Sequence, residues 1–509
     1  MQAVLTPEQM AAADRAAIAA GTPPLVLMER AGWAVAEAVV RVGGGAYGRR
    51  VLVVCGKGNN AGDGLVAARL LAAWGAMPTV VFLDDPASLK GDARTNLERL
   101  RGVRRLVFGQ PSFGRELARS DVVVDAIVGT GFRGSLSGPA AAAVEAVNAS
   151  GRPVVAVDIP SGVDGVTGHV EGPAIRGTVT VTMAAPKLGI VVHPGSELAG
   201  TVEVADIGIA TPRPPAVVGM PEARDVAAVL GRRPLDSHKR SVGTVLIVAG
   251  SVGMSGAMAL AASGALRTGA GLVTMATVAS IAREVDQTVV EATTLPLPET
   301  TQGTIAAGAV GPVLERASTV DAVAIGPGLT TNPETVEAVR KLVAALELPV
   351  VVDADGLNAL AGDPGILAHR TFPTVVTPHP GELGRLLGTW SSEVQADRLG
   401  SARDAAHRLQ AAVVLKGYRS IVADPSGATV VVTTGGPALA TGGTGDVLTG
   451  VTVTLLAGRA DPFAAAWAGS WIHGRAGDVL ERLLGARGVV AGDLPAAIAG
   501  VTRDLEEEL

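Results

Sequence analysis

The sequence predicts an α/β protein made of two doubly wound, three-layer domains. Short apolar runs alternate with helical patterns through most of the 509 residues. Many of these runs are apolar on both faces, which is typical of parallel strands covered by helices on both sides. One proline-rich segment, residues 210–225, has the stiff, extended composition of a linker and divides the pattern in two. We therefore expect one domain at residues 1–215 and a second at residues 222–509.

Composition narrows the class of protein. The net charge of −6 argues against a nucleic-acid partner, because such proteins concentrate lysine and arginine. The one cysteine, Cys55, closes an apolar run and is expected to be a buried small residue in a reducing compartment. No apolar stretch approaches the roughly 18 residues that span a bilayer, and the N-terminus lacks the pattern of a signal peptide. We expect a cytoplasmic protein without a membrane partner.

The first domain is predicted to open with a helix, because Thr6, Pro7 and Gln9 read as an N-cap, a first-turn proline and a capping-box partner. A further helix is expected at residues 64–74. The run at 201–208 alternates apolar and polar residues, which indicates an edge or antiparallel strand. The strands of this domain are expected at residues 50–55, 79–84, 121–128, 153–160, 178–184 and 201–208.

The second domain repeats the alternation of strands and helices. A helix is expected at residues 333–346, in "PETVEAVRKLVAAL". The strands are expected at residues 243–250, 271–278, 322–328, 349–355, 374–380 and 412–417.

A glycine-rich segment, "GKGNNAGDG", follows the first strand of the first domain. Gly56, Gly58 and Ala61 have the spacing G-x-G-x-x-A, and Asp84 ends the next strand. This is close to the fingerprint of a dinucleotide-binding turn. A glycine-rich turn without a ligand is the alternative, and the neighbouring polar residues leave a third interpretation open.

Polar residues follow three strands of this domain. Asn59, Asn60 and Asp63 lie in the glycine-rich segment, Asp125 precedes "IVGTGFRG", and Asp158 precedes "IPSG". The carboxyl ends of parallel strands meet at one edge of the sheet, so these groups should converge. Amide, carboxylate and serine oxygens suit a hard cation, and the glycines at 129, 131 and 134 allow backbone amides to approach a phosphate.

The second domain has its own glycine-rich segment, "TGGTGDVLTG", at residues 441–450. A glycine-rich turn at the start of a helix offers free N–H groups to an anion, and the segment is not a Walker loop. Asp446 would repel a phosphate unless it had a task. It could take a proton from a substrate hydroxyl that attacks a phosphoryl group. A plain glycine turn is the alternative.

"NNAGDGLV", "DAIVGTGFRG", "VDIPSGVDG" and "APKLG" resemble the NAD(P)H-hydrate epimerase family. The resemblance implies a Rossmann-like domain in which Asn60, Asp125 and Ser161 hold a potassium ion. Asp158 would meet the damaged nicotinamide ring as a catalytic group, and Lys187 is a further candidate. The implied substrate-binding residues are Asn59, Asn60, Ala61, Gly62, Asp63, Val128, Gly129, Thr130, Gly131, Phe132, Arg133, Gly134 and Asp158.

"IGPGL", "DADGLNAL", "TPHPGEL", "VLKG" and "TGGTGDVLTG" occur in this order and resemble the NAD(P)H-hydrate dehydratase family, which is ribokinase-like. The resemblance implies Asp446 as the catalytic base, with Mg²⁺ and ADP, or ATP, as the phosphoryl donor. The residues implied to contact the hydrate are Ala257, Gly328, His379 and Asp446. Those implied to contact the nucleotide are Lys416, Gly417, Gly442, Gly443, Thr444 and Gly445.

Together the two resemblances imply repair of NAD(P)HX, the hydrate formed when water adds across the 5,6 double bond of the reduced nicotinamide ring. One domain would interconvert the R and S epimers, and the other would dehydrate the S form. The expected partners are these small molecules, and a homo-oligomer is expected. A ribokinase-like small-molecule kinase with an accessory N-terminal nucleotide-binding domain is the alternative, and a non-catalytic nucleotide sensor is a third. The choice between ADP and ATP stays open.

Overall fold

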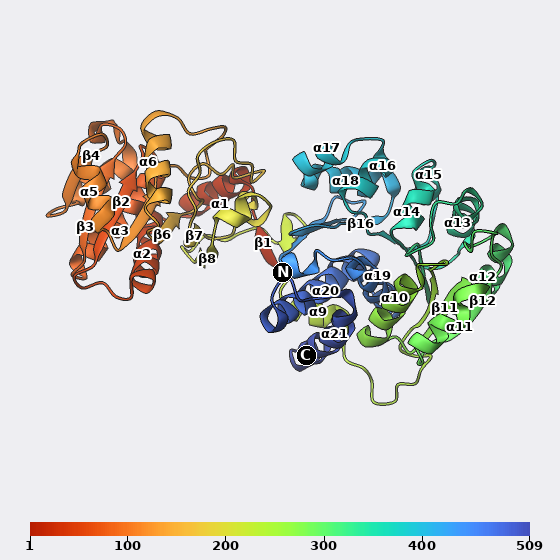
Figure 1. Cartoon of the computed structure of the whole chain (residues 1–509). Helices are drawn as coiled ribbons and strands as arrows, with labels where there is room; N and C mark the ends of the chain where they lie inside the picture. Colours follow the sequence, from red (N-terminus) through yellow and green to blue (C-terminus); the bar gives the residue numbers. More distant parts are fainter. The chain divides into compact units, whose positions relative to one another are not determined.

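The computed structural model describes all 509 residues and divides into two compact units, residues 2–218 and 219–509. Figure 1 shows the chain coloured along its sequence. The division falls inside the proline-rich segment. No helix has the length and apolar character needed to cross a bilayer.

The first unit is built on a seven-stranded parallel sheet with the order β4-β3-β2-β5-β6-β7-β8. Edge strand β8 alternates in sequence as expected, and it pairs parallel to β7. Its strands are β1 (Gln2–Val4), which lies outside this sheet, β2 (Arg50–Cys55), β3 (Met77–Phe82), β4 (Arg104–Val107), β5 (Val122–Ala126), β6 (Val154–Val157), β7 (Val179–Met183) and β8 (Thr201–Ala205). Its helices are α1 (Pro7–Ala19), α2 (Pro24–Gly43), α3 (Asn59–Ala73), α4 (Gly91–Arg99), α5 (Ser112–Arg119), α6 (Gly138–Ala149), α7 (Leu188–Val191) and α8 (Gly195–Leu198), with a 3₁₀ turn at Pro86–Ser88.

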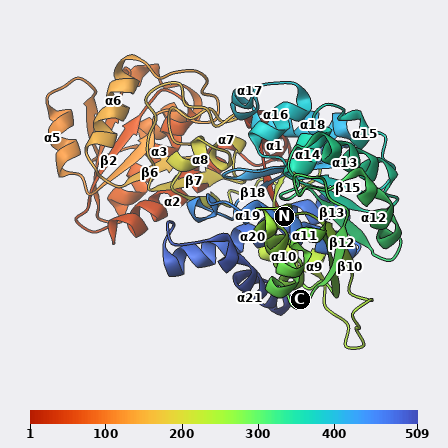
Figure 2. The same cartoon turned by 45° about the vertical axis from the view of Figure 1, so that its right-hand side comes forward.

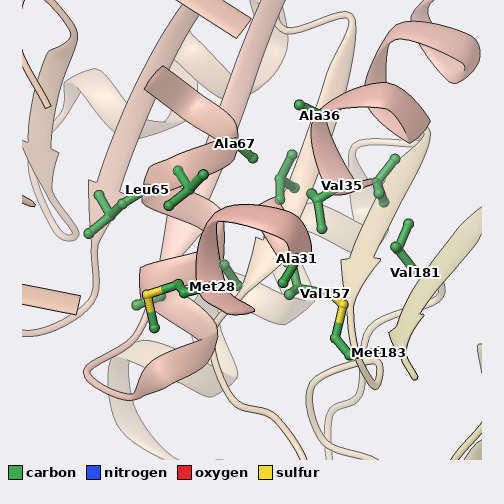
Figure 3. Close-up of a cluster of buried hydrophobic side chains, with 14 of the residues drawn as sticks. Met28, Ala31, Val35, Ala36, Leu65, Ala67, Val157, Val181 and Met183 are labelled. Carbon is green, nitrogen blue, oxygen red and sulfur yellow. The ribbon is translucent and has the colours of Figure 1, made fainter. Parts of the chain in front are cut away.

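The core of the first unit lies where α2 and α3 cover the sheet. Figure 3 shows Met28, Ala31 and Val35 of α2 beside Val181 and Met183 of β7. Cys55 is fully buried in this core, as the sequence predicted. Met28 and Met183 also line a cavity, so the core extends to the candidate site.

The strands of the second unit lie in one sheet in the order β9-β18-β17-β16-β15-β14-β13-β10-β11-β12. Its strands are β9 (Val218–Met220), β10 (Thr244–Val248), β11 (Leu272–Val278), β12 (Thr293–Leu297), β13 (Ala322–Ile325), β14 (Val350–Val352), β15 (Thr374–Val376), β16 (Ala412–Leu415), β17 (Ser420–Ala423) and β18 (Thr429–Val432). The pairs from β12 to β16 are parallel, but β16–β17 and β17–β18 are antiparallel. Strands β17 and β18, which the sequence pattern did not predict, depart from the parallel pairing of the predicted strands, because short turns and not crossover helices join β16, β17 and β18.

Helices cover both faces of this second sheet. Helices α10, α19, α20 and α21 pack against one another as one group, and Figure 2 shows α13, α14, α16 and α18 as another. The helices are α9 (Ala223–Leu230), α10 (Ser255–Thr268), α11 (Ala279–Thr288), α12 (Val310–Ala317), α13 (Pro333–Ala345), α14 (Asp355–Leu360), α15 (Gly365–Ala368), α16 (Pro380–Leu387), α17 (Ser391–Ala396), α18 (Arg398–Leu409), α19 (Thr444–Ala457), α20 (Pro462–Leu484) and α21 (Leu494–Glu507), with 3₁₀ turns at Ala307–Ala309, Pro437–Leu439 and Ala491–Asp493. The predicted doubly wound α/β class is confirmed in both units.

Candidate functional site

A cavity of about 1130 Å³ opens at the carboxyl ends of the strands in the first unit. This is the edge at which open α/β sheets bind ligands. Of the predicted residues, the cavity is lined by Asn59, Asn60, Asp63, Val128, Gly129, Thr130, Gly131, Phe132, Arg133 and Asp158. Ala61, Gly62 and Gly134 are not among its lining residues. Ala61 and Gly62 face the core instead, because the segment predicted as a turn is the first turn of α3.

Asn60, Asp125 and Ser161 lie together beneath this cavity. The Ser161 N–H and Oγ–H donate to the two carboxylate oxygens of Asp125 at 2.8 and 2.6 Å, and Asn60 Nδ2 donates to the Val128 carbonyl at 3.0 Å. Burial raises the pKa of Asp125 to about 6, although hydrogen bonds from Ser161 and the Ile127 N–H oppose the rise. A buried carboxylate with this cost of ionisation is a group that a cation would stabilise.

Asp158 and Lys187 form an ion pair at the cavity wall. Lys187 Nζ lies 2.5 Å from Asp158 Oδ1 and also donates to Thr182 Oγ1 and the Met183 carbonyl, at 3.1 and 2.7 Å. The Lys187 side chain is completely buried, so its charge depends on this pairing. Asp158 has a φ of 67°, a left-handed conformation that is rare for a residue other than glycine. Strain of this kind is concentrated at functional sites.

Two further carboxyl groups line the same cavity, Asp14 of α1 and Asp63 of α3. Burial raises the pKa of Asp63 well above its usual value, and the charges of Asp158 and Asp14 raise it further. Burial likewise raises the pKa of Asp14, and the charge of Lys187 opposes this rise. Asp84 and Asp92 line the cavity as well, so it gathers five carboxyl groups beside the basic groups of Lys57, Arg133 and Lys187.

The second site lies at the start of α19. Gly443 caps this helix with a φ of 90°, and no side chain accepts from its first N–H groups. The positive φ favours glycine here, and a Cβ on Gly443 would lie 2.6 Å from Leu260 Cδ1, so the leucine side chain would have to shift for any other residue. Asp446 lies in the first turn. Burial raises its pKa from 3.8 to about 7; the charges of Asp353 and Asp355 add to the rise, and that of Lys416 opposes it.

Lys416 is held beside this helix start by carboxylates. Its Nζ lies 2.7 Å from Asp353 Oδ1 and 3.8 Å from Glu382 Oε2. Burial lowers the pKa of Lys416, but these two carboxylates outweigh burial and the net shift is upward. The other Asp353 oxygen accepts from Thr449 Oγ1 of α19 at 2.7 Å. A cation and a free helix N-terminus thus lie side by side, which suits a polyphosphate.

The remaining predicted residues of the second unit have different surroundings. His379 caps α16, because its Nδ1 accepts from the Gly381 N–H at 2.9 Å while Glu382 accepts from the His379 N–H at 2.7 Å. Gly328 has a φ of 65°, and a Cβ there would lie 3.0 Å from the Ala257 Cβ, so these two predicted residues are neighbours. Gly417 follows Lys416 with a φ of 145°.

Sequence reasoning assigned no role to Asp14, Asp353 or Glu382. Asp353 and Glu382 lie within the motifs "DADGLNAL" and "TPHPGEL". Asp353 follows a strand and Glu382 lies in the first turn of a helix, and these positions could have identified both carboxylates as site residues. Asp14 gave no such signal. Its place at the cavity depends on the packing of α1, which a periodic pattern does not report.

Comparisons with known proteins find one family model within each unit. Residues 245–499 match the family model described as NAD(P)H-hydrate dehydratase, and residues 24–189 match the model of the YjeF-related protein N-terminus. The chain is 45% identical over 499 residues to a bifunctional NAD(P)H-hydrate repair enzyme of Moorella thermoacetica, covering 96% of this chain and 94% of the relative.

Two solved structures resemble the second unit. An ADP/ATP-dependent NAD(P)H-hydrate dehydratase from Bacillus subtilis, co-crystallised with ATP and Mg²⁺, is 32% identical; the match covers 57% of this chain and 99% of that chain, with a TM-score of 0.48. A ribokinase-like superfamily protein from Enterococcus faecalis is 22% identical, and the match covers 58% of this chain and 98% of that chain, with a TM-score of 0.50. The latter likeness concerns the fold alone and agrees with the predicted ribokinase-like class. With its two matched family models and a full-length relative at this identity, the chain belongs to the family of bifunctional NAD(P)H-hydrate repair enzymes.

Proposed function

We propose that residues 2–218 interconvert the R and S epimers of NAD(P)HX, and that residues 219–509 dehydrate the S epimer with a nucleotide as phosphoryl donor. The observation that carries the proposal is the placement of Asp446 in the first turn of a glycine-capped helix, with Lys416 close to the same turn. A carboxylate among phosphate-binding groups would repel the phosphate, so its presence there points to a role in the reaction. Activation of a substrate hydroxyl is such a role.

Dehydration then proceeds in two steps. Asp446 takes the proton of the substrate hydroxyl as its oxygen attacks the terminal phosphoryl group, and the shortened nucleotide departs. Lys416 and the N–H groups of residues 442–445 hold the phosphates during this transfer. The phosphorylated oxygen then leaves as phosphate, and loss of the proton from C5 restores the double bond. Phosphorylation matters because hydroxide itself is a poor leaving group.

Mg²⁺ fits the second site as an ion brought in with the nucleotide. No group of three histidine, cysteine or carboxylate side chains is arranged to hold a metal in this chain. Mg²⁺ characteristically binds one or two carboxylates together with substrate phosphates, which is compatible with this donor set. When bound, it would neutralise phosphate charge.

K⁺ fits the first site. Asn60, Asp125 and Ser161 offer hard oxygen ligands but only one certain negative charge, and Asp125 is a fully buried carboxylate. That set suits a large monovalent ion better than Mg²⁺, which demands a tight octahedron. The ion would neutralise Asp125 and order the loop at residues 128–134, which lines the cavity.

The test uses the full-length protein and purified S-NADPHX, with ADP and ATP in parallel and with Mg²⁺ present or omitted. Return of the absorbance of the reduced ring, dependent on nucleotide, is the expected result. R-NADPHX supplied alone should react only after conversion to S. Nucleotide consumption without return of the reduced ring would support the kinase alternative and overturn the proposal.

A further inference from the structure

Four of the ionisable groups that line the cavity of the first unit interact with one another: Asp14, Asp63, Asp158 and Lys187. Two of them are committed to each other. Asp158 Oδ1 accepts from Lys187 Nζ, from Thr182 Oγ1 and from the Met183 N–H, at 2.5, 3.2 and 3.1 Å. One oxygen of Asp158 is therefore occupied by three donors.

The other two carboxyl groups are uncommitted. The side chains of Asp14 and Asp63 have no hydrogen-bond or ion-pair partner within the chain. Both residues are partly exposed, because both line the cavity. Asp63 is the fifth residue of α3 and lies within the glycine-rich segment, so the start of this helix fixes its position. Asp63 is thus an uncommitted carboxyl group that faces Asp158 and Lys187 and is free to carry a proton to and from a ligand.

Asp14 reaches the cavity because α1 is anchored at its start. Leu5 pairs with the chain at Lys187: its N–H donates to the Pro186 carbonyl at 2.9 Å, and its carbonyl accepts from the Leu188 N–H at 3.0 Å. Thr6 then caps α1 in a capping box with Gln9. Met10, Asp14 and Ile18 are four residues apart, share one helix face, and all line the cavity.

The charged groups that face Asp63 come from three other elements. Asp158 follows β6, Asp14 lies on α1, and Lys187 precedes α7. The two carboxylates favour the protonated form of Asp63 and the ammonium opposes it, while burial favours the neutral form most. The geometry thus places a carboxyl group with a raised pKa beside the Asp158–Lys187 ion pair, a combination suited to acid–base catalysis.

Inversion of the hydrate requires a proton at its hydroxyl oxygen. Water adds to the reduced ring with its oxygen on C6, because the neighbouring N1 stabilises positive charge at that carbon. Inversion at C6 can therefore occur by loss and return of water. An acid protonates the hydroxyl, the C6–O bond breaks with its electron pair leaving in water, and the N1 lone pair forms a C6=N1 iminium. The planar ring then turns its other face toward the same carboxylate, water adds to that face, and the proton released by this water returns to the carboxylate.

We propose that Asp63 is the acid–base residue of this inversion, that the Asp158–Lys187 pair places a fixed carboxylate near the iminium, and that Asp14, which faces Asp63 across the same cavity, is a positioning residue that acts through it. The inference rests on the proposed epimerase function. One carboxyl group suffices because its proton is given in the first half of the reaction and regained in the second.

The experiment uses full-length protein and pure R-NADPHX without nucleotide, so that the dehydratase is idle, with R and S separated by chromatography. Asp63→Asn should lower the rate of epimerisation by about 10²–10⁴-fold, and Asp63→Glu should recover part of it. Asp92→Asn is the matched control, since Asp92 lines the same cavity but has no assigned role. Binding of NADPH to each variant reports whether the cavity is intact.

Two readouts separate a chemical role from a structural one. In H₂¹⁸O, wild-type epimerisation should place ¹⁸O at C6 above the enzyme-free background. Asp14→Asn should move the loss of activity at high pH to lower pH, because removing that charge lowers the pKa of Asp63. Retention of ¹⁶O, or an Asp63→Asn variant that binds NADPH and epimerises at the wild-type rate, would overturn the inference. A wild-type protein that does not epimerise would instead refute the proposed function.

Discussion

Replacing Asp446 by asparagine should abolish most dehydration and at the same time stabilise the second unit. Loss of a general base costs about 10²–10⁴-fold in rate. Nucleotide binding should survive or tighten, because a negative charge disappears from the N-terminus of α19. Catalysis and stability are therefore expected to change in opposite directions.

The size of the stability change follows from the pKa of Asp446, which rises from 3.8 to about 7 on folding. For a carboxyl group whose pKa is raised, the folded state loses stability as pH rises from about 4 to about 7, and the penalty is complete above that range. At about 1.4 kcal/mol per pKa unit, the penalty is at most about 4 kcal/mol at pH 8 and about 2 kcal/mol at pH 5. Solvent screening at the partly exposed carboxyl reduces both figures.

The assay is denaturant unfolding of wild type and Asp446→Asn at pH 5 and pH 8, beside dehydration rates between pH 5.5 and 8.5. The variant should gain more stability at pH 8 than at pH 5, and wild-type dehydration should fall as pH drops through about 7. Dehydration by the variant at the wild-type rate, or an equal stability difference at both pH values, would refute the reasoning.

Three further outcomes are expected. Exchange of potassium for a bulky organic cation, or Asp125→Ala, should weaken R-to-S conversion and leave dehydration of S unchanged; equal epimerisation in both cases would reduce this cluster to ordinary hydrogen bonding. Residues 1–215 and 222–509, expressed separately, should each fold and keep one activity, and an inactive half from a soluble preparation would mean that the site needs both parts. His473, buried with Nε2 at 2.9 Å from the Thr444 carbonyl, should hold the phosphate-binding turn in place; His473→Leu should cost about 1 kcal/mol, seen as a roughly fivefold higher KM for the nucleotide, with exposed His407→Leu as the control.

The fold was predictable where the sequence pattern was strong. Runs such as "VLVVC" and "VLIVAG" are apolar on both faces and are buried strands in the structure. Strand β4, with the sequence "RRLV", escaped prediction because two of its four residues are charged and the strand is an exposed edge. Strands β17 and β18 were not predicted because each is only four residues long, and their antiparallel direction depends on turn geometry, which apolar runs do not encode.

The candidate sites were predictable as far as motifs reach. The motifs located Asp446, Lys416 and the strand-end polar groups, and the assignment of individual contacts remains a prediction, as does a homo-oligomer. The motifs could not identify Asp14, because its place at the cavity depends on how α1 is anchored beside Lys187. The side chain of Asp158 accepts three hydrogen bonds and that of Asp63 accepts none, and this difference likewise depends on three-dimensional packing.

The ammonium groups of Lys187 and Lys416 show where this sequence places lysine and not arginine. Of 42 basic residues only six are lysines, at positions 57, 90, 187, 239, 341 and 416, and the other 36 are arginines. Two of these six, Lys187 and Lys416, are the ion-paired cations of the two sites. At Lys187, three acceptors meet the three protons of one compact ammonium in a fully buried pocket, and a planar guanidinium would be both too large and wrongly shaped. In a protein this rich in arginine, the choice of lysine at these positions is therefore a matter of shape as well as charge.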